Sequence, residues 1–182
     1  MAAISPRLHS ALRGALGGAL ATAPMTAAMV GIHKMLPAQH QDPLPPQKIV
    51  EDLGSAAGAE SRLPAEQKQP LVWTAHYSYG ALMGAIYGGL IAHEHRSRAP
   101  IAEGICFGLG VWAANYLLGL PAVGMRASAY REPNDRNAMM ILSHVVWGGT
   151  LGALDATPVL ERPSAPPPAS KTSRIAEPAC DV

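Results

Sequence analysis

Four long stretches without Asp, Glu, Lys or Arg dominate the hydrophobic pattern of the chain. They cover residues 14–32, 69–92, 104–125 and 137–154. A helix needs about 20 residues to cross the hydrocarbon core of a bilayer, whereas a helix in water needs a charged or polar outer face. Four uncharged stretches in one chain therefore predict an all-α, polytopic membrane protein with four transmembrane helices.

These stretches also predict the domain organisation. We expect an N-terminal segment over 1–13, a four-helix transmembrane domain over 14–156 and a disordered tail rich in Pro and Ser over 157–182. Within the domain, the spans are expected at 14–33, 72–92, 101–122 and 138–155. Arg7 and Arg13 before the first span also fit a cleaved signal peptide, but the glycine spacing described below favours a retained helix.

The longest connection, between the first two spans, contains the sequence PLPPQKIVEDLGSAAG. Pro46 suits the first turn of a helix, and Ile49, Val50 and Leu53 would share one face of it. A short amphipathic helix at the membrane interface is therefore expected. Lys and Arg divide equally between the two sides of the membrane, and only the dense basic turn after the second span favours cytoplasmic termini.

Glycines four residues apart recur in every span. The pairs and triplets are Gly14 and Gly18, then Gly80, Gly84 and Gly88, then Gly104 and Gly108, and finally Gly148 and Gly152. Residues at this spacing lie on one face of a helix, where glycine lets two backbones approach closely. The pattern predicts a tight bundle, and it leaves open whether the contacts form within the chain or in a homo-oligomer.

The second and fourth spans share the pattern H-x-x-aromatic-G-x-x-x-G-A. It begins at His76 in HYSYGALMGA and at His144 in HVVWGGTLGA. The pattern indicates a duplicated helical hairpin, with two units in the same orientation around an axis along the membrane normal. Chance recurrence in a chain rich in Ala and Gly is the alternative.

Composition supports the membrane interpretation and narrows the partners. Hydrophobic residues make up 48% and charged residues only 15%, where about a quarter is usual for a soluble domain. The net charge is +1 and the basic residues are scattered, so we expect the lipid bilayer as partner and no nucleic acid. The two cysteines, Cys106 and Cys180, form no disulfide framework and no metal-binding spacing.

Four polar residues inside or beside the spans are candidates for a functional site. His33 ends the first span, His76 begins the second, Asn115 lies within the third and His144 lies about two turns into the fourth. Ionisable side chains in a bilayer are costly and often functional. His76 and His144 could converge to bind a metal, ligate haem or relay protons. Alternatively, each could bond a neighbouring backbone and hold helices together.

No motif gives positive support to an enzyme, because the chain has no phosphate-binding loop, no supported catalytic triad and no zinc spacing. The pattern is compatible with a small transport or permeation protein whose paired histidines line a central path. The alternatives are a structural or accessory protein that associates through glycine-rich faces, and a haem- or metal-binding protein. No cofactor is specified.

Several short motifs carry a family resemblance. PLPPQKIVEDL, HYSYGALMGAIYG, LGLPAVGM and SHVVWG make residues 14–155 similar to the YagU-type family of bacterial inner-membrane proteins of unknown function. The resemblance implies a multi-pass protein of the bacterial cytoplasmic membrane and no established reaction. Two positions depart from the family pattern: Gln47 stands where Arg is usual, and Met140 stands where an acidic residue can precede the second histidine by one turn.

Overall fold

A computed structural model describes residues 5–56, 58, 65–92, 97–122, 124 and 128–157. Every regular element in these ranges is helical, as the sequence predicts. The elements in chain order are α1 (Pro6–His33), η1 (Ala38–His40), α2 (Pro45–Ala56), α3 (Ala65–Ile86), η3 (Tyr87–Ile91), α4 (Pro100–Ala113), η4 (Ala114–Gly119), α5 (Leu120–Ala122) and α6 (Asn134–Ala156). The expected tail beyond residue 157 lies outside the described residues.

The long helices begin earlier than the uncharged stretches. The Ser5 hydroxyl accepts a hydrogen bond from the backbone N–H of Leu8 and caps α1, while Pro6 occupies the first turn. The helix therefore includes residues 6–13, which the sequence pattern assigns to a separate segment. In the same way α3 begins at Ala65 and α6 at Asn134, because charged residues at a helix end do not interrupt its backbone hydrogen bonds.

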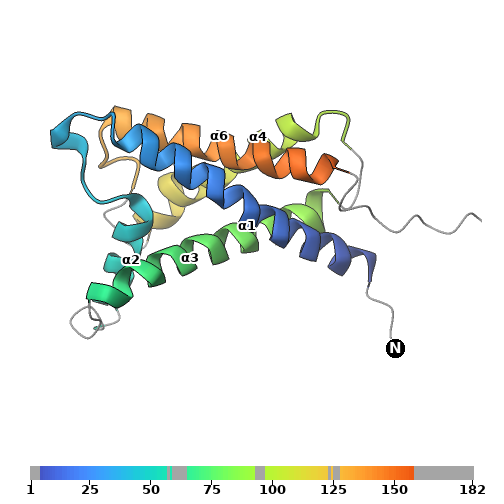
Figure 1. Ribbon diagram of the computed structural model, residues 1–182, viewed down its shortest axis with the longest axis horizontal. Helices are drawn as coiled ribbons and strands as arrows, with labels where there is room; N and C mark the ends of the chain where they lie inside the picture. The colour runs from blue at the N-terminus through green and yellow to red at the C-terminus, as the bar shows by residue number, and fades with distance from the viewer. Residues whose placement is uncertain are drawn as a thin grey trace, which may run out of the picture.

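The four long helices form an open arc. α1, blue in Figure 1, packs against both α3 and α6, and α4 packs against α6. α3 and α4 therefore stand at the two ends of the arc. The amphipathic helix expected after the first span is present as α2, which packs against α3 near one end of the molecule.

Glycine brings α1 and α3 into backbone contact. A Cβ atom added at Gly84 would overlap the carbonyl oxygen of Gly14, and one added at Gly88 would overlap the carbonyl oxygen of Ser10. Gly18 is equally close to the carbonyl oxygen of Gly80. No side chain fits between these backbones, so the glycine spacing of both helices is used within the chain.

The contact between α4 and α6 is built in the same manner. A Cβ atom at Gly104 would overlap the carbonyl oxygen of Gly148, and one at Gly152 would overlap that of Pro100. At Gly108 the added atom would come 2.5 Å from the carbonyl oxygen of His144. The chain itself thus fills all the glycine faces that the sequence singles out.

Two of the helices contain π-helical turns. The turn η3 continues α3, and η4 continues α4 before the short α5. A π-turn inserts an extra residue into the helix and is often found at functional sites. The turn η4 contains Asn115, Tyr116 and Gly119, all of which line the cavity described below.

Many large apolar side chains lie on the surface of the molecule, and several polar side chains are buried. Leu8, Leu12, Leu16 and Leu20 form an exposed stripe along one face of α1, while Gly14, Gly17 and Gly18 of the same helix are buried. Large apolar side chains are also exposed on the other helices. They are Leu82 and Ile86 on α3, Leu90 on η3, Ile101 on α4, Leu118 on η4 and Leu142 on α6. Apolar side chains such as Met139 and Leu151 form most of the buried set, which also includes Ser10, Thr22, Arg136, Ser143 and His144.

Length and composition allow two of the described helices to cross a membrane. They are Pro6–His33 and the continuous helix Pro100–Ala122. α3 and α6, which the sequence pattern also predicts as spans, fall short on this measure. Polar side chains within their uncharged stretches lower the mean hydropathy, including His76 in α3 and Asn137 and His144 in α6.

Candidate functional site

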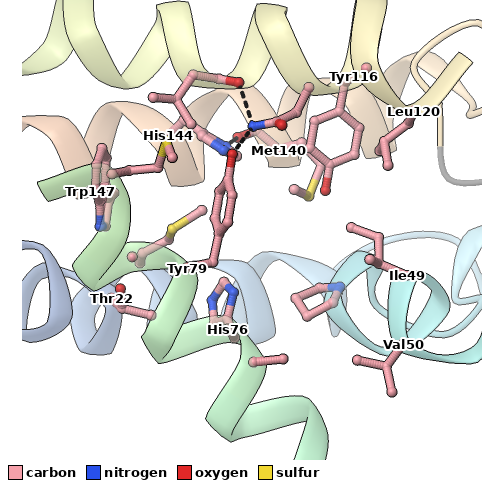
Figure 2. A pocket seen from close by; sticks show the side chains of 18 residues that line it. Thr22, Ile49, Val50, His76, Tyr79, Tyr116, Leu120, Met140, His144 and Trp147 are labelled. Atoms are coloured by element: carbon pink, nitrogen blue, oxygen red, sulfur yellow. Dashed lines mark hydrogen bonds between the residues drawn. The ribbon is translucent and has the colours of Figure 1, made fainter. Parts of the chain in front are cut away.

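A cavity of about 420 Å³ lies inside the arc. All four long helices contribute to its walls, and Pro46, Ile49 and Val50 of α2 cover one end. Figure 2 shows His76 and Tyr79 entering from α3, opposite the side of the cavity where His144 and Tyr116 lie. Pockets of this size accommodate small organic molecules.

Most of the wall is apolar. Methionine contributes from three different helices, through Met25 of α1, Met83 of α3 and Met140 of α6. The polar members are few and converge from separate elements; they are Thr22, His76, Tyr79, Asn115, Tyr116 and His144. Among the described residues that line the cavity, none is Asp, Glu, Lys or Arg. The cavity therefore suits an uncharged, largely apolar molecule with a small polar group.

The exposed residues of the cavity lining lie on α3 and η4, which indicates a lateral mouth between these two elements. Ala75 and Tyr79 on α3 are exposed, as is Gly119 at the end of η4. The residues contributed by α1 and α6 are buried by contrast, including Met25 and His144. The cavity thus has a floor on α1 and α6 and a mouth on the outer flank of the molecule.

An aromatic cluster closes the bundle beyond the floor. The rings of Trp147 and Phe107 lie 6.1 Å apart, and Phe107 lies 5.3 Å from the ring of Tyr87. Leu151 and Ala21 pack into the same cluster. Packed side chains therefore fill the bundle at this level.

The structure brings His76 and His144 into the wall of the same cavity. The Nδ1 atom of His144 lies 2.8 Å from the carbonyl oxygen of Met140, one turn earlier in α6. Its ring packs edge-on against Tyr116 at a centroid distance of 6.2 Å. His76 differs, because its Nε2 atom is buried and has no hydrogen-bond partner among the described residues.

Asn115 connects the two ends of the arc. Its side-chain nitrogen lies 2.6 Å from the hydroxyl oxygen of Tyr79 on α3 and 2.8 Å from the carbonyl oxygen of Val111 on its own helix. Both hydrogen bonds are drawn as dashed lines in Figure 2. The bond to Tyr79 spans the lateral mouth of the cavity.

His33, the fourth candidate, lies away from the cavity. Its Nε2 atom is 3.0 Å from the backbone oxygen of Asp42 in the connection that leads to α2. This hydrogen bond joins the end of α1 to the loop that follows it.

Sequence reasoning missed an ionic cluster at the start of α6. Arg136 is 1% exposed, and its guanidinium donates to the backbone oxygens of His40, Asp42 and Pro43 at 2.9, 3.0 and 3.0 Å. Its Nε atom also donates to Glu132. One buried arginine therefore holds the loop that precedes α2, and the i, i+4 spacing of Glu132 and Arg136 was the available sequence signal.

The same cluster fixes α2 itself. The Nζ atom of Lys48 lies 2.8 Å from a carboxylate oxygen of Glu132. Nearby, Nδ1 of His40 lies 2.6 Å from the carboxylate of Asp135, and this hydrogen bond lowers the pKa of the Asp135 carboxyl. These bonds hold the cover of the cavity against the end of α6.

The cavity offers few side chains that could bind a metal ion. Among the described residues, no group of three or more His, Cys, Asp or Glu side chains comes together. Any metal in the cavity would therefore depend on His76 and His144 together with weaker ligands such as methionine sulfur.

These features define an all-helical protein with two helices apolar enough to span a membrane and a laterally open, mostly apolar cavity. The chain belongs to a family described as Protein of unknown function (DUF1440), whose sequence profile matches residues 25–153. That range includes His33, His76, Asn115 and His144. No curated protein and no solved structure matches the chain.

Proposed function

We propose that this protein is a four-span integral membrane protein that binds a small lipophilic molecule in its cavity. The observation that carries the proposal is the lateral mouth between α3 and η4, because it opens on a flank that bears exposed apolar side chains such as Leu82 and Leu118. A molecule dissolved in the hydrocarbon of a bilayer could enter there without crossing water.

The exposed leucines support membrane insertion of the whole bundle. The stripe from Leu8 to Leu20 on α1 would be an unfavourable surface in water. In lipid the same surface is favourable, and close backbone packing at glycine supplies the attraction between helices. The uncharged part of α6, residues 137–154, is about 27 Å long at 1.5 Å per residue, close to the thickness of a hydrocarbon core.

A duplicated helical hairpin accounts for the similar packing of α3 on α1 and of α6 on α4. Gly84 packs on the carbonyl of Gly14 as Gly152 packs on the carbonyl of Pro100, which is the correspondence that the H-x-x-aromatic-G pattern predicts for α3 and α6. The resemblance to YagU-type proteins favours the bacterial inner membrane. With both termini in the cytoplasm, α2 and the covered end of the cavity would face the periplasm.

Binding is favoured over permeation and over association through glycine. The aromatic cluster of Tyr87, Phe107 and Trp147 would have to move to open a path through the bundle. The glycine faces are filled by the chain's own helices, so a homo-oligomer would have to use a different surface.

The test is to close the mouth of the cavity. Ala75 lies at the mouth, and Ala75→Trp should block it without disturbing the buried floor. Native mass spectrometry of protein extracted from membranes should find co-purifying lipophilic molecules on the wild type, and much less on this variant. Leu82→Trp is the matched control, because Leu82 is exposed on the same helix and does not line the cavity. Equal retention by all three proteins would contradict the proposal.

A further inference from the structure

The hydrogen bonds of the cavity determine which polar group a ligand should carry; this inference rests on the proposed binding function. A carbonyl oxygen only accepts hydrogen bonds, so Nδ1 of His144 must hold the hydrogen that it shares with Met140. His144 is 5% exposed and no carboxylate lines the cavity with it among the described residues. Its ring is therefore neutral, and Nε2 keeps an unshared electron pair that accepts a hydrogen bond.

Asn115 and Tyr79 add one acceptor and one donor. The side-chain nitrogen of Asn115 donates one hydrogen bond to the carbonyl oxygen of Val111 and the other to the hydroxyl oxygen of Tyr79. The amide oxygen of Asn115 is left as an acceptor, and the hydroxyl hydrogen of Tyr79 is left to donate.

His76 contributes a group that lacks a partner. Its Nε2 atom is buried and unbonded among the described residues, and its ring points into the cavity from α3 (Figure 2). Leaving a buried nitrogen unpaired is unfavourable. A ligand group that bonds this nitrogen would relieve that cost.

We infer that the ligand is an uncharged lipophile with a hydroxyl group, such as a long-chain alcohol or a phenol. The hydroxyl donates to Nε2 of His144 and accepts from Tyr79 or His76. A ketone, an ester or an ether cannot satisfy the acceptors, because it has no hydrogen to donate. A charged headgroup would lie in the cavity without an opposite charge, since no described lining residue is Asp, Glu, Lys or Arg and the ring of His144 is neutral.

A matched pair of probes tests the ligand class. The probes are 10-bromodecan-1-ol and its methyl ether, which share an apolar body and differ in the hydroxyl hydrogen. Bromine quenches tryptophan fluorescence on contact, and Trp147 lines the cavity. Binding would be measured on full-length protein in nanodiscs, with Trp73 and Trp112 replaced by Phe so that Trp147 is the only reporter.

The alcohol should bind about 5- to 10-fold more tightly than the ether, which corresponds to one net hydrogen bond. His144→Leu should reduce this preference to less than about 2-fold, while the ether keeps its affinity. His33→Leu is the matched control, because His33 bonds Asp42 outside the cavity, and it should keep the full preference.

The outcomes separate the two proposals. Equal binding of both probes to the parent protein would overturn the hydroxyl inference and leave lipophile binding standing. A preference that survives in His144→Leu would overturn the role of His144. Quenching by neither probe would mean that the cavity does not bind lipophiles, and the proposed function would fail with it.

Discussion

The indole Nε1 of Trp147 on α6 donates a hydrogen bond to the carbonyl oxygen of Gly18 on α1, at 3.1 Å and across 129 residues of chain. The same oxygen accepts from the hydroxyl of Thr22 at 2.8 Å. The bond joins the first half of the chain to the second beside the floor of the cavity, where both Thr22 and Trp147 lie.

Removing this bond should cost little stability. Trp147→Phe keeps an aromatic ring and loses the N–H donor, and the Gly18 oxygen still has Thr22 as a partner. The expected loss in the free energy of unfolding from the hydrogen bond is about 0.5–1.5 kcal/mol, to which the smaller ring in the core adds a packing cost. The loss would be measured by unfolding in mixed micelles of dodecyl maltoside and SDS. Trp73→Phe is the comparison at a site without this bond, and a larger loss there than at Trp147 would contradict the assignment.

The glycine contacts predict a contrast between two alanine substitutions. A Cβ atom at Gly84 would overlap the backbone of Gly14, which cannot move aside as a flexible side chain can. Gly84→Ala should therefore lower the free energy of unfolding by about 1–3 kcal/mol or more. Gly110 has no atom within 4 Å of an added Cβ, so Gly110→Ala should be neutral or slightly stabilising. Equal effects of the two substitutions in the same assay would show that α1 and α3 are not in backbone contact.

The buried arginine at the start of α6 is expected to be among the most sensitive positions. Arg136→Met removes a buried donor from Glu132 and from the backbone oxygens of His40, Asp42 and Pro43, of which Glu132 keeps Lys48 and Asp42 keeps His33 as partners. Removing one partner of buried hydrogen bonds and of a buried ion pair in this way costs about 3–5 kcal/mol. Arg136→Lys should not restore the loss, because an ammonium cannot reproduce the planar fork of donors. The thermal stability of both variants would be compared with that of Arg131→Met, at an exposed arginine nearby. If Arg136→Met lowered the thermal stability no more than Arg131→Met does, Arg136 would not hold the loop that precedes α2.

The pair of His40 and Asp135 predicts a pH effect. The hydrogen bond from His40 lowers the pKa of the Asp135 carboxyl from its ordinary value of 3.8. A carboxyl with a lowered pKa in the folded state stabilises the fold fully above that ordinary value and loses this contribution as the pH falls through the lowered one. Stability measured against pH should therefore fall less steeply below pH 3.8 in Asp135→Asn than in the wild type. Parallel acid profiles would be inconsistent with the bond.

The sequence predicted the parts of this structure that depend on helical spacing. Glycines four residues apart must share a face, and the contacts of Gly84 and Gly104 follow from that. His76, Asn115 and His144 are polar residues in apolar stretches, and all three line the cavity. Their polarity within uncharged stretches was the signal that singled them out.

Other features depend on tertiary arrangement or have no local signal. Arg136 bonds backbone oxygens at positions 40–43, and only the packing of α6 beside the loop after α1 brings these segments together. The π-helical turn at Ala114–Gly119 leaves no mark in the pattern of polar residues. The extension of α1 back to Pro6 depends on the cap at Ser5, whereas a search for uncharged residues stops at Arg13.

Sidedness of the connection between α3 and α4 tests the four-span arrangement most directly. In a background with Cys106 and Cys180 replaced by Ser, single cysteines would be placed at Gln41, Ser97 and Ser5 and labelled with a membrane-impermeant maleimide on intact cells and on inverted vesicles. Four spans predict that Ser97→Cys reacts from the same side as Ser5→Cys and that Gln41→Cys reacts from the opposite side. If Ser97→Cys instead reacted from the same side as Gln41→Cys, then α3 would not cross the membrane, and a cavity that opens between α3 and η4 into the bilayer would be ruled out.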